Sequence, residues 1–67
     1  MIKYNKLFYM MIDRKIRPGA LEQSGISRPT IARMHRDEPI DTKTIDKLCK
    51  ALQCQPGDIM TYTEDNA

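Results

Sequence analysis

Four arginines supply the side chains of this sequence that are best suited to chemistry with a partner. Arg28, Arg33 and Arg36 follow one another closely, and Arg17 precedes them. An arginine guanidinium presents rigid N–H donors that bind phosphate or the edge of guanine in a bidentate manner. No acidic residue occurs from Ser27 to Arg36, although a solvated helix usually mixes both signs of charge. The segment therefore favours a polyanionic partner.

Charge is divided unevenly along the 67 residues, whose formal net charge is +2. Residues 1–36 hold eight lysines and arginines against two acids, a net charge of +6, and residues 37–67 hold three lysines against seven acids, a net charge of −4. Such asymmetry gives one end of a small protein a positive field that attracts polyanions. Nucleic acid is the first candidate partner, and a basic surface without a partner is the alternative that charge alone leaves open.

A helix over residues 28–36 is expected to carry three of these arginines. Ser27 can cap its start, and Pro29 falls in the first turn, where proline is tolerated. At about 100° per residue, Ile31 and Met34 lie about 60° apart and face a core. The opposite side holds small and basic residues, which let a helix approach a groove closely: Pro29, Ala32, Arg33 and Arg36, with Arg28 at its edge.

The element that must position this helix is a weaker helix, expected over residues 18–24. Pro18 suits its first turn, but Gly19 destabilises such a helix by about 1 kcal/mol relative to alanine. Contacts with the rest of the chain must therefore hold it, and the candidates are Ala20, Leu21 and Ser24.

A glycine turn joins the two helices. Gly25 suits the left-handed residue that ends a helix, and Ile26 follows as an apolar plug. A helix, a short glycine turn and a second helix form a helix-turn-helix unit.

Two longer helical patterns supply most of the expected core. The first runs over residues 6–15 with Asn5 as its expected N-cap, and the second runs over residues 42–52 with Asp41 as its N-cap. Apolar residues recur in both at spacings of three and four: Leu7, Met10 and Met11 in the first, and Ile45, Leu48, Cys49 and Leu52 in the second.

The two ends of the chain carry weak strand signatures, at residues 1–4 and 60–63. Pro56 is expected to begin a short closing helical turn, and residues 64–67 are expected to fray. The sequence thus predicts a single all-α domain over residues 1–67, with four to five helices around a central helix-turn-helix and a small terminal β pairing.

Nothing in the sequence favours catalysis, a cofactor or a small-molecule substrate. It holds one histidine, no convincing serine–histidine–acid or paired-carboxylate arrangement, and no phosphate-cradling glycine loop. Cys49 and Cys54 fit no common metal pattern and are expected as reduced, packed thiols. A metal site that combined them with His35 would need a fourth ligand. His35 is expected to interact with the last carbonyls of its helix, with a nucleic-acid phosphate as the other option.

The apolar runs are short. The longest, Leu7–Ile12, cannot span a bilayer, and no charged-then-apolar leader is evident. We therefore expect no membrane association and a cytoplasmic location.

In their order and spacing, these motifs resemble the Cro and lambda-repressor type (XRE) helix-turn-helix family, especially its short stand-alone members. The resemblance spans about Tyr4 to Met60. It is carried by KLFYMMIDRK from Lys6, SGISRPTI from Ser24, IDKLCKAL from Ile45 and GDIM from Gly57. Three features depart from the family pattern: the order Ala20-Leu21, Arg17 in place of a phosphate-binding glutamine, and Pro29 in place of a polar residue.

The resemblance implies a sequence-specific double-stranded DNA-binding transcriptional regulator, a repressor that occupies an operator, encoded by a bacterium, phage or mobile element. Its third helix would enter the major groove by the N-terminal part. The implied roles are base reading by Arg28 and Arg33, contacts to phosphate or base edges by Ser27 and Thr30, and backbone contacts by Arg36 and Arg17.

A homodimer is also expected, because one such helix covers only a few base pairs and two half-sites would lie about 34 Å apart. Three regions are candidates for the dimer interface: the first helix, the terminal strands and the region of the last two helices. Phe8 and Ile12 widen the apolar arc of the first helix, so a terminal strand or a second subunit is expected to cover them, unless they are simply exposed. That arc and the acidic second half favour an alternative, a protein-interaction module such as an antirepressor or a toxin–antitoxin subunit.

Overall fold

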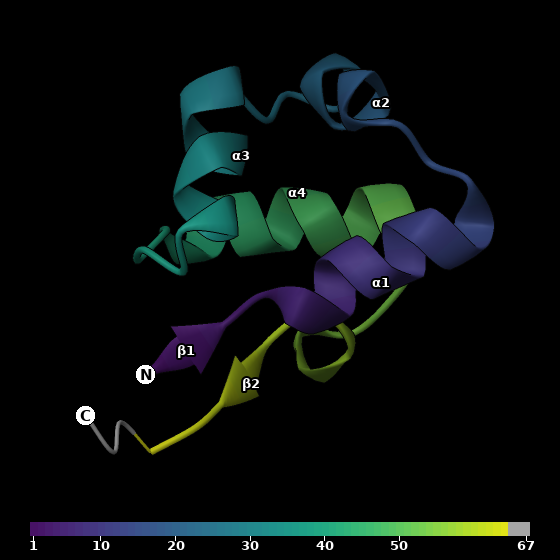
Figure 1. Ribbon diagram of the computed structural model, residues 1–67. Coiled ribbons are helices and arrows are strands. Elements are labelled where there is room, and N and C mark those ends of the chain that lie inside the picture. The colour runs from purple at the N-terminus through teal and green to yellow at the C-terminus, as the bar shows by residue number, and fades with distance from the viewer. Residues whose placement is uncertain (65–67) are drawn as a thin grey trace.

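The computed structural model describes residues 1–64, so residues 65–67 of the predicted frayed tail lie outside the described part. Four α-helices, one 3₁₀ turn and a small antiparallel sheet make up the fold (Figure 1). This arrangement confirms the predicted class of a compact, mostly helical domain around a helix-turn-helix. The elements are β1 (Ile2–Lys3), α1 (Asn5–Arg14), α2 (Pro18–Gln23), α3 (Arg28–His35), α4 (Thr42–Leu52), η1 (Pro56–Asp58) and β2 (Thr61–Tyr62).

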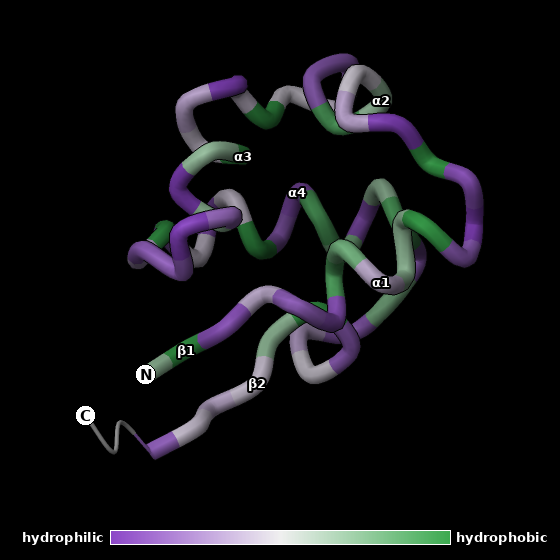
Figure 2. The backbone as a smooth tube through the Cα atoms, in the orientation of Figure 1, coloured by the Kyte–Doolittle hydropathy of each residue, from purple (hydrophilic) through white to green (hydrophobic). Residues whose placement is uncertain are grey.

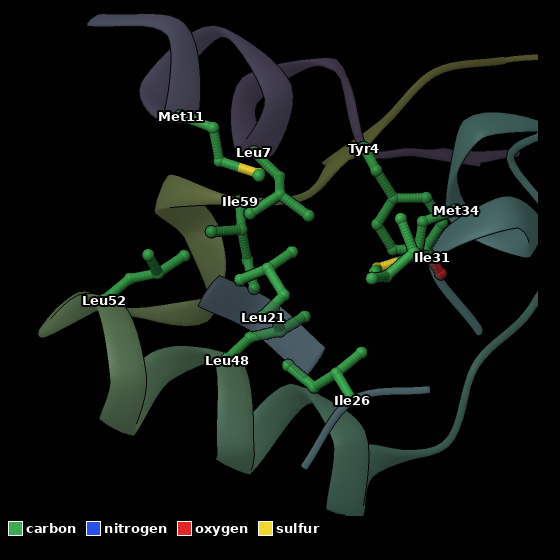
Figure 3. Packing of buried hydrophobic residues seen from close by; sticks show 10 residues of the cluster. All are labelled: Tyr4, Leu7, Met11, Leu21, Ile26, Ile31, Met34, Leu48, Leu52 and Ile59. Carbon is green, nitrogen blue, oxygen red and sulfur yellow. The ribbon is translucent and has the colours of Figure 1, made fainter. Parts of the chain in front are cut away.

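The core is built from apolar side chains of all four helices, the glycine turn and both terminal regions (Figure 3). Ile31 and Met34 of α3 are buried, which confirms the face predicted for that helix. Within residues 1–64 the ten buried side chains are Tyr4, Leu7, Met11, Leu21, Ile26, Ile31, Met34, Leu48, Leu52 and Ile59.

Helix α1 begins one residue earlier than predicted. Its N-cap is Tyr4, without a side-chain cap, and Asn5 is already helical, so the expected Asn5 cap was wrong. The reason is that the Tyr4 side chain is buried and its N–H donates to Asp37 Oδ1 at 3.2 Å. These tertiary contacts set the start of the helix. Its last residue is Arg14, and the C-cap residue Lys15 has a left-handed φ of 57°.

Helix α2 is held through one buried side chain. Leu21 is 1% exposed, whereas Ala20 and Ser24 lie on the exposed side, so the contacts expected of those two were wrong. The Ser24 hydroxyl donates instead to the Ala20 carbonyl of its own helix at 3.1 Å. A short helix with one apolar anchor depends on the turn that follows it.

The glycine turn has the predicted form. Gly25 has a φ of +91°, and Ile26 is buried. The Ile26 N–H donates to the Leu21 carbonyl at 3.1 Å, and Lys47 Nζ of α4 donates to the Gly25 carbonyl at 3.3 Å. The turn that joins α2 to α3 is thus anchored to the core and to α4.

Helix α4 runs over the predicted residues and alternates hydrophobic and hydrophilic positions along its length (Figure 2). Asp41 caps it by accepting the Thr44 N–H at 2.8 Å. At its other end the Leu52 carbonyl accepts a hydrogen bond from Arg14 Nη1 at 2.6 Å, which joins α4 to α1.

The terminal strands pair as predicted but are only two residues long. Ile2 lies opposite Tyr62, and Lys3 opposite Thr61. The pairing stops before Tyr4 because that residue turns into the core and starts α1. Among the described helices, none is long and apolar enough to cross a membrane.

Candidate nucleic-acid interface

The start of α3 is shaped by two hydroxyl groups. Ser27 Oγ accepts the Thr30 N–H at 3.3 Å and lies 2.9 Å from Thr30 Oγ1. The first contact caps the helix as predicted. In the second contact one hydroxyl donates to the other. The accepting hydroxyl still has its own proton, which it can donate to another acceptor at the N-terminal end of α3.

Arg28 does not stand alone at this end. Its Nε donates to Glu22 Oε1 of α2 at 2.8 Å, while its own side chain stays 84% exposed. The segment from Ser27 to Arg36 lacks acids, but the fold brings an acid to it from the neighbouring helix. Because only the path of the glycine turn decides which α2 residue meets α3, sequence spacing alone carried no signal for this pair.

A second ion pair lies at the C-terminal end of α3. Arg36 Nε donates to Glu38 Oε2 at 2.5 Å. This hydrogen bond lowers the pKa of the Glu38 carboxyl, and the positive charge of Arg33 adds to that shift. The same bond raises the pKa of Arg36. Glu38 was not among the predicted site residues, although its position two residues after Arg36 is a local signal.

Arg17 and Arg33 are exposed and make no ion pair with any described residue. Arg17 is the N-cap residue of α2 and has an extended backbone. Arg33 borders an open hollow of about 320 Å³, which it shares with Thr30 of α3 and the chain leading into α4. These two guanidinium groups are the candidate donors least engaged within the described part of the chain.

The two remaining predicted residues, Pro29 and Ala32, have no side-chain donor and contribute only to the shape of the surface. Pro29 is exposed, and Ala32 is half-buried beside a groove between α2 and α3. The structure therefore places seven of the eight candidate residues on α3 or directly beside its ends, and it places Arg17 just before α2 as the N-cap residue. The seven are Ser27, Arg28, Pro29, Thr30, Ala32, Arg33 and Arg36.

His35 ends α3 and packs against α1. Its ring stacks on Phe8, with centroids 3.9 Å apart and an interplanar angle of 12°. The stack covers part of Phe8. For this side chain the sequence predicts cover from a terminal strand or a second subunit, or simple exposure, and not a contact with His35. Ile12, in contrast, is 72% exposed. The histidine thereby helps to fix the C-terminal end of α3 relative to α1.

The two thiols lie near the C-terminal end of α4, Cys49 within the helix and Cys54 two residues after it. Cys54 follows α4, and its N–H donates to the Cys49 carbonyl at 3.1 Å. Burial raises the pKa of the Cys54 thiol, and neighbouring Cys49 raises it further. No group of three or more ligating side chains suited to a metal ion occurs within residues 1–64.

Comparison with known proteins gives one consistent family. The model of the Cro/C1-type HTH DNA-binding domain matches residues 6–65. The HTH-type transcriptional regulator YozG of Bacillus subtilis (strain 168) is 37% identical over 59 residues, which cover 84% of this chain and 70% of that protein. The crystal structure of the transcriptional regulator VanUg is similar, with a TM-score of 0.87 and 31% identity over 96% of this chain and 87% of that one. The chain belongs to the Cro/C1-type helix-turn-helix DNA-binding domain family.

Proposed function

We propose that this protein is a sequence-specific transcriptional regulator that represses by occupying an operator in double-stranded DNA. The observation that carries the proposal is the exposed face of α3. It presents Arg28 and Arg33, with Arg36 directly after its end, on a helix that is capped at Ser27 and anchored by two buried side chains. Such anchoring holds the exposed groups in fixed positions, as base recognition requires.

In this proposal the N-terminal part of α3 enters the major groove. Arg28 and Arg33 read base edges, and the hydroxyls of Ser27 and Thr30 contact phosphate or a base edge. Pro29 and Ala32 keep the helix close to the groove floor. Arg17 and Arg36 bind the backbone, and Arg36 would exchange Glu38 for phosphate.

We also propose that two copies act together. A helix of eight residues reads only a few base pairs, so specific binding calls for two half-sites about 34 Å apart on one face of the DNA. A regulator of this kind acts in the cytoplasm of a bacterium or phage host, where the DNA lies.

One selection experiment tests these proposals together. Protein is incubated with random double-stranded DNA, and the bound molecules are sequenced. We expect a pseudo-palindromic motif with half-sites about 10 base pairs apart, and an affinity that falls steeply as salt rises. Placing the selected site over a reporter promoter should lower transcription when the protein is present.

Three results would contradict parts of this picture. Absence of binding at low salt would show that the protein alone does not bind DNA. Binding that appears only with a second protein would favour the interaction module. A single, non-repeated motif would contradict the dimer. Reporter activation would contradict repression while leaving the DNA-binding role intact.

A further inference from the structure

We infer that Glu22 is a positioning residue that holds Arg28 in the orientation needed to read a guanine. This inference rests on the proposed function, because it assigns a second residue to the same DNA-reading end of α3. Its starting point is the hydrogen bond of 2.8 Å between Arg28 Nε and Glu22 Oε1.

The atoms used in this pair leave the reading edge of the guanidinium open. Arginine carries one N–H on Nε and four on its two Nη atoms. The carboxylate of Glu22 occupies Nε, so both Nη atoms remain available, and two parallel N–H groups match guanine O6 and N7. The side chain of Arg28 is 84% exposed, so a partner can reach that edge.

The carboxylate itself is held in place. Glu22 lies directly after the buried Leu21, and its side chain is only 35% exposed. Its carbonyl accepts the Gly25 N–H at 3.0 Å, so the residue belongs to the closed turn between α2 and α3. A long arginine side chain loses rotamer freedom when it binds, and a partner already holding it reduces that loss.

Charge separates this role from that of a phosphate clamp. A carboxylate beside an arginine repels an approaching phosphate and weakens that arginine as a backbone contact. The same carboxylate helps an arginine that must present one edge to an uncharged base. An exposed ion pair adds little to stability, so Glu22 should act on discrimination between sequences more than on folding.

The second ion pair of α3 offers a matched control. Arg36 uses the same Nε atom toward Glu38, but at the C-terminal end of the helix, where the proposal places a backbone contact. Glu38→Ala should strengthen or leave unchanged the binding to every sequence alike, because it removes a negative charge beside a phosphate-binding arginine.

The experiment begins from the operator selected by the wild-type protein. Every single base-pair variant of that operator is measured against wild type and Arg28→Ala, which identifies the base pair that Arg28 reads. We expect Arg28→Ala to lose about 5- to 100-fold discrimination there. Glu22→Ala should lose about 3- to 10-fold at the same base pair, while its affinity for random DNA stays equal or rises.

Two further variants make the test specific to orientation. Glu22→Gln keeps an oxygen that accepts from Nε, so its discrimination should fall between wild type and Glu22→Ala. In the Arg28→Ala background, Glu22→Ala should cause no further loss at that base pair. Circular dichroism melting of each variant ensures that only folded protein is compared.

The inference is overturned if Glu22→Ala discriminates as wild type does, or if it weakens specific and random DNA by the same factor. It is also overturned if Arg28→Ala loses discrimination at no base pair. In each case the wild type still selects an operator, so the proposed function as a sequence-specific regulator stands, and the last outcome removes only the base-reading role of Arg28 from it. If the wild type selects no sequence at all, the proposed function itself fails.

Discussion

Helices α3 and α4 are folded by the same devices. Each is capped by a side-chain oxygen that accepts the N–H three residues later, from Ser27 in α3 and from Asp41 in α4. Each also buries two apolar side chains on its inner face. Capping and burial thus hold both helices in place, and neither marks one of them as functional.

Their outer faces differ. The exposed face of α4 mixes lysines with an acid, as expected for a solvated helix, and Lys47 on that face donates an intramolecular hydrogen bond to the Gly25 carbonyl. The exposed face of α3 carries arginines and small residues, and its two acidic partners come from outside the helix. In the proposed function the two helices therefore differ because of the side chains that they present outward, and not because of how they pack.

The largest expected effects are losses of stability when the buried side chains that anchor α3 and α4 are removed. Met34→Ala and Leu48→Ala each remove a side chain with no exposed surface, so each should lower the free energy of unfolding by about 2–5 kcal/mol. Ile12→Ala is the matched control, because that side chain is 72% exposed and should cost less than about 0.5 kcal/mol. Urea titration measures all three, and a small cost for only one core variant would show that the two helices are not anchored alike.

The next effect tests the difference between the outer faces. Arg33→Ala should relax discrimination at one base position by about 1–3 kcal/mol. Lys50→Ala removes a charge from the exposed face of α4 and should leave discrimination unchanged. Arg17→Ala should weaken selected and random DNA alike, as expected for a phosphate contact. Equal losses on both kinds of DNA from Arg33→Ala would contradict its assignment to a base.

A smaller pair of effects concerns the turn that places α3 against α4. Gly25→Ala puts a side chain on a φ of +91° and should destabilise the fold by about 1–2 kcal/mol. Gly19→Ala lies in α2 with no atom near the added carbon, so it should stabilise by about 0.4–1 kcal/mol. Thermal melting of both variants gives the two signs, and destabilisation by Gly19→Ala would indicate a close approach that the structure does not contain.

The smallest expected effect is a pH dependence of stability that the Asp41 cap of α4 should show and the Ser27 cap of α3 should not. Hydrogen bonds from Thr44 lower the pKa of the Asp41 carboxyl, so its ionised form stabilises the folded state. That stabilisation is complete above the unfolded pKa, near about 3.9, and is lost as pH falls through the folded pKa. The difference in melting temperature between wild type and Asp41→Ala should therefore shrink below about pH 4.

Ser27→Ala is the control for that measurement, because the serine hydroxyl does not titrate in this range. Its melting-temperature difference from wild type should stay constant with pH. A parallel decline for both variants would assign the pH effect to the whole protein and not to the cap of α4.

Local sequence signals predicted most of the helical framework. The bounds of α4 and the start of α3 follow from side-chain caps and a 3.6-residue period, which depend on neighbours within one turn. The inward placement of Ile31 and Met34 follows from the same period. The roles given to the eight candidate DNA contacts, and the dimer, remain predictions.

Residues adjacent in the chain were enough to specify the helices, the inward faces of α3 and α4, the left-handed Gly25 and the excess of positive charge on α3. Contacts between distant parts of the chain set the start of α1 at Tyr4, make Leu21 the one buried anchor of α2 and stack His35 on Phe8. The tertiary structure also brings Glu22 to Arg28. These contacts depend on how the helices cross and on the path of the turn, and both are settled by the packing of the whole core.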